Sequence, residues 1–202
     1  MKPTKIFPRI LTITVIGCCL VQGCVKSASN HNPYVGNMND FSYSGQLTDD
    51  SCVYRMNALG EEVCVAEFQE RFVWVDYSAP WCTPCSTQAK VIKALENEVG
   101  YQAVFLTVIT SASAEFQSMP TQQTARRWAR RFGLYPAKVV VATDKWGMTV
   151  PTHILFSPKG QTLYRAQGFH SKKQIRKIME SYMRDWKNWL DTGAVADWMR
   201  AA

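Results

Sequence analysis

Hydrophobic and polar positions alternate between strand-like and helix-like patterns over residues 66–190. Runs rich in β-branched and aromatic residues predict strands, because these side chains pack well on a pleated sheet. Apolar residues that recur every three or four positions predict helices with one buried face. The predicted strands are residues 72–77, 103–110, 138–142, 152–156 and 162–166, and the predicted helices are one that includes Cys85, one over 121–132 and one that opens with Ser171.

The order of these elements predicts an α/β fold with helices on a central sheet. The run 103–110 is almost continuously apolar, as expected of a parallel strand that is covered on both faces. The turn at 157–160 joins the last two strands as a hairpin, and Ser171 with Gln174 forms the capping-box pattern that begins a helix. Element order alone does not indicate the function of the domain.

The N-terminal residues have the layout of an export signal. A short cationic segment precedes the apolar stretch 10–17, which is too short to span a bilayer. The stretch is followed by Val-Gln-Gly-Cys, which resembles a bacterial lipobox, in which a small residue precedes a lipidated cysteine. We therefore predict a lipoprotein signal peptide over residues 1–23 and lipidation of Cys24.

Other interpretations of the N-terminus remain open. Cys18 follows Val-Ile-Gly and is a competing lipidation site with a shorter signal. Cleavage by ordinary signal peptidase, or a retained anchor, would leave Cys24 without a role. Each interpretation implies export of the domain, and disulfides persist in exported proteins.

Residues 24–50 predict a flexible tether, because Ser, Asn, Gly and Asp occur there with only scattered aromatic residues and no hydrophobic period. A flexible chain of this length has an r.m.s. span of roughly 25–30 Å, enough to hold a small domain clear of lipid headgroups. The predicted organisation is completed by an N-terminal extension with a cysteine pair at 51–65, the folded domain at 66–190 and a C-terminal tail at 191–202.

Composition and charge exclude several classes of protein. With 47% hydrophobic and 19% charged residues in a chain of 202, the protein can bury a core and is not wholly disordered. No apolar run of about 18 residues follows the N-terminus, so a polytopic membrane protein is excluded. The formal charge of +7 falls to +4 once the predicted signal peptide, with Lys2, Lys5 and Arg9, is cleaved off. A net charge of +4 is too small to indicate a nucleic-acid partner.

The candidate chemistry is concentrated in the motif Trp-Cys-Thr-Pro-Cys, between a predicted strand and a predicted helix. Its cysteines, Cys82 and Cys85, have a spacing that closes a small disulfide ring. Cys82 projects beyond the helix N-terminus, where free N–H groups and the positive end of the dipole favour a thiolate. A thiolate attacks disulfides through a mixed-disulfide intermediate, so we assign Cys82 as the nucleophile and Cys85 as the resolving thiol.

Zinc sites use the same cysteine spacing, but zinc requires two further ligands. Cys52 and Cys64 are the only other cysteines in the predicted mature domain, and the histidines of the sequence form no cluster. We therefore predict no bound metal and no cofactor other than the redox-active cysteine pair itself. Cys52 and Cys64 are expected to form a structural disulfide after export, worth roughly 3 kcal/mol if unstrained; a second redox pair or free thiols are the alternatives.

The residues around the motif resemble the thioredoxin superfamily, in particular its exported, membrane-tethered TlpA/ResA-like branch. Residues 75–82 read Val-Asp-Tyr-Ser-Ala-Pro-Trp-Cys, and residues 150–152 read Val-Pro-Thr, similar to the cis-proline loop of the family. The resemblance implies a thioredoxin-like fold, with a central mixed sheet flanked by helices. It also implies a strand-helix insertion around 125–142, between the cysteine helix and the cis-proline strand.

The same resemblance implies roles for residues near the cysteines. Asp76 would be the buried carboxylate that relays a proton to or from Cys85, and burial in an apolar strand suits that role because it disfavours the charged form. Trp81 and the Val150 backbone would contact an extended substrate. Pro151 would present that backbone through a cis peptide bond, which is low enough in energy only before proline.

Departures from the family leave the redox direction open. Lys90 stands where members usually carry a proline, no lysine accompanies Asp76, and the inner dipeptide is Thr-Pro instead of the commoner Gly-Pro.

Several residues have an alternative interpretation. An alternative for Asp76 is a carboxylate satisfied by local hydroxyls such as that of Ser78. His153 follows the cis-proline loop and could approach the cysteines, although a hydrogen-bonded strand histidine is the expected reading. The arginines within 126–131 are expected to form a solvated helix face, with docking to anionic headgroups or an acidic partner as the alternative.

These observations predict a lipid-anchored, periplasm-facing thiol–disulfide oxidoreductase of the bacterial cell envelope that reduces disulfides of exported proteins. Reduction requires a membrane electron donor, in this branch typically of the DsbD/CcdA type. An oxidase or isomerase is the alternative within the same class. An envelope assembly or interaction lipoprotein that keeps a thioredoxin scaffold is the alternative from another class, because the segments before residue 66 and after residue 185 exceed a minimal redox enzyme.

Overall fold

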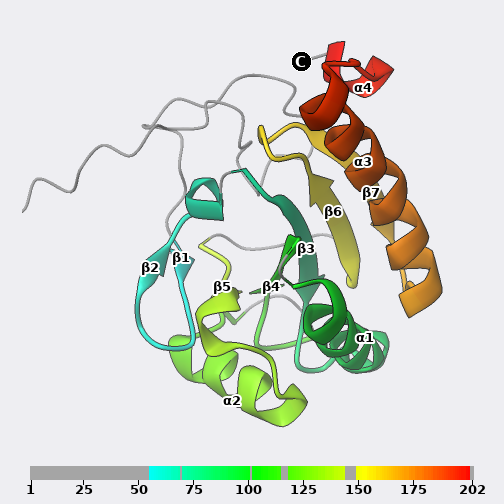
Figure 1. The fold of residues 1–202 in the computed structure, drawn as a ribbon. Coiled ribbons are helices and arrows are strands. Elements are labelled where there is room, and N and C mark those ends of the chain that lie inside the picture. The colour runs from blue at the N-terminus through cyan, green and yellow to red at the C-terminus, as the bar shows by residue number, and fades with distance from the viewer. Residues whose placement is uncertain (1–54, 69, 101, 115–117, 144–148, 201–202) are drawn as a thin grey trace, which may run out of the picture. The chain divides into compact units, whose positions relative to one another are not determined.

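A mixed five-stranded sheet lies at the centre of the fold, with its strands in the order β5-β4-β3-β6-β7 (Figure 1). The computed structural model describes residues 55–68, 70–100, 102–114, 118–143 and 149–200. Strands β3, β4 and β5 are parallel to one another, whereas β6 and β7 join the sheet antiparallel. The strands are Phe72–Ser78 (β3), Ala103–Ile109 (β4), Val139–Val141 (β5), Thr152–Phe156 (β6) and Thr162–Gln167 (β7).

The predicted signal peptide, the tether and the candidate lipidation sites Cys18 and Cys24 lie outside the described residues, as does Cys52. Those assignments stay predictions, and so do the domain boundaries drawn from the sequence. Within the described ranges, no helix combines the length and the apolar character needed to cross a bilayer.

Strand β3 occupies the middle of the sheet and is buried along its whole length. On one face, its odd-numbered residues belong to an apolar cluster: Val73, Val75 and Tyr77. On the other face, Phe72 and Trp74 belong to a second cluster, which also contains both motif cysteines and buried residues of the helices. Because side chains alternate along a strand, Asp76 and Ser78 share the face of Phe72 and Trp74.

In the described part of the chain, three helices of more than ten residues accompany the sheet: α1 (Thr83–Val99), α2 (Gln122–Phe132) and α3 (Lys172–Thr192). Helices α2 and α3 begin at capping boxes, with Thr121 and Ser171 as the N-caps. Both end at a glycine in the left-handed region, Gly133 and Gly193, where a side chain would be strained. Helix α1 buries one stripe of residues toward the core: Cys85, Gln88, Ala89, Ile92 and Leu95.

The predicted fold class is confirmed, including the insertion. Helix α2 and strand β5 lie between α1 and β6 in the chain, and β5 adds to the parallel edge of the sheet beside β4. The structure also contains short elements that the hydrophobic pattern did not predict, because they span hardly more than one period. These are β1 (Arg55–Met56), β2 (Glu62–Val63), α4 (Asp197–Arg200) and the 3-10 turns η2 (Val65–Phe68) and η3 (Pro136–Lys138).

The C-terminal segment packs back on helix α3, and Figure 1 shows α4 beside the end of that helix. The indole N–H of Trp198 donates to the carboxylate of Asp185 at 3.2 Å. The Trp198 ring also lies against Tyr182 and Trp186, with ring centroids 5.8 Å and 6.4 Å away. The tail therefore contributes aromatic contacts to the end of α3.

Candidate active site

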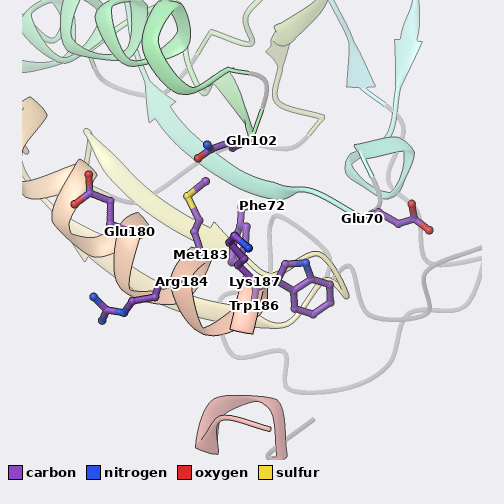
Figure 2. A pocket seen from close by; sticks show the side chains of 8 residues that line it. All are labelled: Glu70, Phe72, Gln102, Glu180, Met183, Arg184, Trp186 and Lys187. Carbon is purple, nitrogen blue, oxygen red and sulfur yellow. The ribbon is translucent and has the colours of Figure 1, made fainter. Parts of the chain in front are cut away.

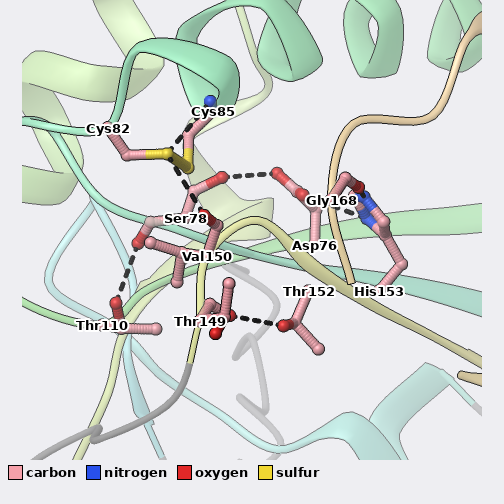
Figure 3. Close-up of a disulfide and its surroundings, with 10 residues drawn as sticks. All are labelled: Asp76, Ser78, Cys82, Cys85, Thr110, Thr149, Val150, Thr152, His153 and Gly168. Atoms are coloured by element: carbon pink, nitrogen blue, oxygen red, sulfur yellow. Dashed lines mark hydrogen bonds and ion pairs between the residues drawn. A yellow bond between two sulfur atoms is a disulfide. The ribbon is translucent and has the colours of Figure 1, made fainter. Parts of the chain in front are cut away.

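The two motif cysteines form a disulfide where strand β3 leads into helix α1 (Figure 3). Cys82 is the N-cap residue of the helix, and its Sγ accepts a hydrogen bond from the backbone N–H of Cys85 at 3.2 Å. Cys85 is fully buried, whereas Cys82 retains 5% exposure. The more accessible sulfur is thus the one at the positive end of the helix, where a thiolate is stabilised after reduction.

The loop before β6 closes over the accessible sulfur. The Val150–Pro151 peptide is cis, and the carbonyl oxygen of Val150 lies 3.6 Å from Sγ of Cys82. Trp81, directly before the nucleophile, is 37% exposed. The structure therefore places Trp81, Val150 and Pro151 around Cys82, and their part in substrate contact stays a prediction.

Asp76 lies on β3 beneath the disulfide layer and is completely buried. Its Oδ2 accepts a hydrogen bond from the Ser78 hydroxyl at 2.7 Å, as the local-hydroxyl alternative anticipated. Figure 3 shows the disulfide, Ser78 and Asp76 in a row, with the hydroxyl in the middle. The carboxyl group is thus held on the cysteine side of the sheet by a donor from its own strand.

His153 contacts the other oxygen of the same carboxyl group. It is the cross-strand partner of Asp76 in the β3–β6 register, and its Nδ1 lies 3.2 Å from Oδ1. Its Nε2 lies 3.0 Å from the carbonyl oxygen of Gly168, so it is a hydrogen-bonded strand histidine, as the sequence indicated. The pairing with Asp76 was not predicted. Only the register between the two strands could have revealed it, because residues directly opposite each other in antiparallel strands have neighbouring side chains.

A second buried histidine shares the same carbonyl group. His170 Nδ1 lies 3.0 Å from the Gly168 oxygen, and its Nε2 lies 2.8 Å from the Tyr164 hydroxyl. The backbone N–H of His170 donates to Oε1 of Gln88 at 2.8 Å, which ties this loop to helix α1. Burial lowers the pKa of His170; the hydrogen bond to Gly168 opposes this shift and the nearby His153 reinforces it.

The remaining predicted features lie away from the redox site or add little to it. Cys64 is buried and disulfide-bonded, but Cys52 is outside the described residues, so their pairing stays a prediction. Among the described residues, no three or more His, Cys, Asp or Glu side chains are grouped to hold a metal ion. The arginines of α2 are exposed, and the Arg126 side chain donates to the Ala58 carbonyl oxygen at 3.2 Å, which fits a solvated helix face.

A surface pocket of about 470 Å³ lies at the other end of strand β3 (Figure 2). Phe72, the first residue of the strand, lines it together with Met183 and Trp186 of α3. Because the cysteines follow the last residue of the same strand, this pocket is not part of the redox site.

Solved structures with a similar fold come from several bacteria. The exposed lipoprotein thioredoxin of Streptococcus pneumoniae aligns with a TM-score of 0.50 and 20% identity over 64% of this chain and 98% of that one. A thioredoxin-family thiol:disulfide interchange protein of Chlorobium tepidum gives 0.53 and 14% over 65% and 93%. A DsbF homologue of Corynebacterium diphtheriae gives 0.55 and 12% over 64% and 83%. No curated protein sequence matches significantly.

The sequence itself gives the family. A family model described as a thioredoxin-like domain matches residues 61–182, which is more than half of the chain. The matched region contains both motif cysteines, the buried Asp76 and the cis Pro151. The chain therefore belongs to the thioredoxin-like domain family.

Proposed function

We propose that the protein is a thiol–disulfide oxidoreductase of the bacterial cell envelope that reduces disulfides of exported proteins. The observation that carries this proposal is the Cys82–Cys85 disulfide at the N-terminus of α1. Cys82 keeps 5% exposure and its sulfur lies at the helix N-terminus, whereas Cys85 is fully buried beside it. This asymmetry is what a nucleophile and a resolving thiol require.

In the first step the reduced Cys82 thiolate attacks one sulfur of a substrate disulfide. A Cys82–substrate S–S bond forms, the substrate S–S bond breaks, and the departing substrate thiolate takes up a proton. The Val150 carbonyl, 3.6 Å from Sγ, marks the edge along which an extended substrate would lie. Trp81 adds an exposed aromatic surface next to the nucleophile.

In the second step Cys85 loses its thiol proton and attacks Sγ of Cys82. The intramolecular disulfide forms, and the second substrate sulfur leaves as a thiolate that is then protonated. Asp76 is the proton acceptor for Cys85 in this proposal, because it is buried on the same face of the sheet and bonded to Ser78. The substrate gains the two electrons that the cysteine pair loses, and its two thiolates take their protons from the solvent, while the Cys85 proton stays on Asp76.

A further turnover requires a dithiol that reduces Cys82–Cys85. We assign this role to a membrane electron donor of the DsbD/CcdA type, and we place the protein on the membrane through a lipid at Cys24. The export-type N-terminus supports this placement. A similar fold in a pneumococcal exposed lipoprotein thioredoxin is in keeping with it. No cofactor beyond the cysteine pair is needed for the electron balance.

The test is capture of intermediates in the exported, full-length protein. The variant Cys85→Ser leaves Cys82 able to attack but removes the resolving thiol, so partner proteins accumulate as mixed disulfides. The matched control is the Cys82→Ser, Cys85→Ser double variant, which should capture none. Equal capture by both variants, or none by either, contradicts the proposed activity.

A redox titration separates the remaining alternatives. A reductase or oxidase pair exchanges with glutathione-range buffers, and its midpoint potential gives the direction. An assembly lipoprotein that uses the disulfide only as a structural bond would keep Cys82–Cys85 oxidised throughout that range.

A further inference from the structure

Three polar side chains, those of Ser78, Asp76 and His153, lie in a row beneath the disulfide, and the proposed exchange involves the first two. Ser78 donates to Asp76, and His153 lies on the far side of the same carboxyl group (Figure 3). Asp76 and His153 are both fully buried. A buried pair of this kind is stable only if its charges are neutralised by neighbouring groups, so the positions of its protons follow from those neighbours.

The hydrogen on Nε2 of His153 is fixed by its partner. Nε2 lies 3.0 Å from the Gly168 carbonyl oxygen, which can only accept a hydrogen bond. The ring therefore carries a hydrogen on Nε2. In a neutral imidazole this leaves Nδ1 with a lone pair and no hydrogen.

That unprotonated nitrogen would face a carboxylate. Nδ1 is 3.2 Å from Oδ1 of Asp76, within ion-pair distance although not aligned as a hydrogen bond. Among the described residues, neither atom has another hydrogen-bond partner. Two unshielded lone pairs at this distance repel in a buried site. One proton between them removes the repulsion, either as a carboxylic acid facing the imidazole or as an imidazolium facing the carboxylate.

Other titratable groups around His153 do not supply that proton. His170 packs edge-on at 4.8 Å between ring centroids, but its Nδ1 is directed to Gly168 and its Nε2 to Tyr164. On the sheet, the titratable group opposite His153 is Asp76 of β3. The shared proton thus belongs to the Asp76–His153 pair.

We propose that Asp76 and His153 form a proton-sharing pair that gives its proton to Cys85 and takes it back during each cycle, with His153 as the positioning residue. The proposal rests on the proposed exchange activity. When a donor thiolate attacks Cys82, the Cys82–Cys85 bond breaks and the Cys85 thiolate receives the proton of the pair. When Cys85 later attacks the mixed disulfide, the same proton returns to the pair.

His153 favours the return of the proton from Cys85 to the pair. Once the pair has given up its proton, the Nδ1 lone pair and the Asp76 carboxylate again face each other at 3.2 Å. The repulsion favours recovery of the proton, and recovery is the event that activates Cys85 for the resolving step. A carboxyl group with an apolar neighbour in place of His153 would lack this contribution.

The first experiment follows the resolving step in the reduced, full-length protein mixed with oxidised glutathione. Acid quenching and mass analysis measure how fast glutathionyl-Cys82 decays across a range of pH. We expect His153→Leu to slow the decay about 10-fold and to shift its pH profile, less than the roughly 100-fold or greater loss expected from removing a general base. His153→Asn restores a hydrogen-bonding group but not a titrating one, and should recover stability without the wild-type profile.

The matched control is His170→Gln. This residue is buried beside His153 and bonded to the same carbonyl, and its hydrogen bonds go to Gly168, Tyr164 and Gln88, not to Asp76. Its pH profile for decay should equal that of the wild type. Identical profiles for His153→Leu and the wild type, or an equal shift in both histidine variants, overturn the proposal.

A second measurement does not depend on exchange or on the folding of a variant. Nitrogen NMR of the wild-type His153 ring should show an Nδ1 signal that moves between the oxidised and reduced protein, and the movement should vanish in Asp76→Asn. An Nδ1 signal that is the same in both redox states overturns the pair. If glutathionyl-Cys82 never forms in the wild type, the proposed activity fails. The NMR spectrum still tests, independently, whether Asp76 and His153 share a proton.

Discussion

Strand β3 buries both of its faces, and the comparison between them separates stability from chemistry. One face is formed by Val73, Val75 and Tyr77, and the other by Phe72, Trp74, Asp76 and Ser78. Burial is nearly the same on both sides. The difference is that the second face carries a carboxyl group and a hydroxyl where apolar side chains would fit.

Polar groups on a buried face are costly unless each has a partner. An unpaired buried donor or acceptor costs roughly 1–3 kcal/mol, and a charged one more. On this face, Asp76 is bonded to Ser78 and lies beside His153, which is bonded to Gly168. On the opposite face the polar atom belongs to Tyr77, and burial raises its pKa well above its usual range, so it stays neutral. Of the polar side chains of β3, the carboxyl group proposed to exchange a proton therefore lies on the same side of the sheet as the cysteines.

The largest effect is expected for Asp76→Asn. The amide fills the same space and can accept from Ser78 while donating to His153, so the fold should be kept. It cannot take the Cys85 proton, and the resolving step should slow roughly 100-fold. Decay of the glutathione mixed disulfide measures the rate, and thermal unfolding of the oxidised protein measures stability. A variant that resolves at the wild-type rate would remove Asp76 from the mechanism.

Val75→Ala tests the other face of the same strand. The side chain is fully buried in the apolar cluster, so its loss should lower the free energy of unfolding by roughly 2 kcal/mol through lost burial and a small cavity. Urea unfolding of the oxidised protein measures this change. The rate and pH profile of exchange should stay those of the wild type. A shifted pH profile would contradict the inference that this face of β3 contributes only to stability.

Ser78→Ala should give a smaller effect on both quantities. Loss of the donor to Oδ2 leaves part of a buried carboxyl group without its partner, which costs about 1 kcal/mol of stability. The resolving rate should fall by only a few fold, because Asp76 and His153 remain together. A loss as large as that of Asp76→Asn would instead make the hydroxyl an obligatory path for the proton.

The smallest effect is a pH dependence of stability from His170. Burial lowers its pKa below the ordinary 6.5, so below that pH the unfolded chain binds the proton more readily than the folded protein does. The stability that neutral His170 contributes is full above about pH 6.5 and is lost as the pH falls toward the lowered value. The gap in melting temperature between the wild type and His170→Gln should therefore narrow from about pH 7.5 to about pH 5.5. A constant gap would contradict it.

The sequence predicted the large elements well because each spans several periods of its pattern. The burial of Cys85, Ala89, Ile92 and Leu95 follows from helical spacing after the motif. Gln88 lies on the same face of the helix and is fully buried, although its polar side chain did not mark it as part of the predicted stripe. Its burial depends on the backbone N–H of His170, a partner from a distant loop that periodicity does not reveal.

The Asp76–His153 contact illustrates what periodicity leaves out. Both residues were noted separately in the sequence, one on each of two predicted strands. Which residues of two strands face each other depends on their register, and that register is set by the whole sheet. The cysteine pair was easier to find, because its geometry is local to one turn of helix.

Trp74 gives this buried face an optical consequence. Its fully buried indole ring lies 5.5 Å from the His153 ring and 6.5 Å from that of His170, measured between centroids. A protonated imidazole quenches the fluorescence of a neighbouring indole, so Trp74 emission falls where the shared proton lies on His153 and is not quenched in this way where it lies on Asp76. Subtracting the spectrum of a Trp74→Phe variant isolates that signal from the other tryptophans and shows, in unlabelled protein, which of the two groups holds the proton.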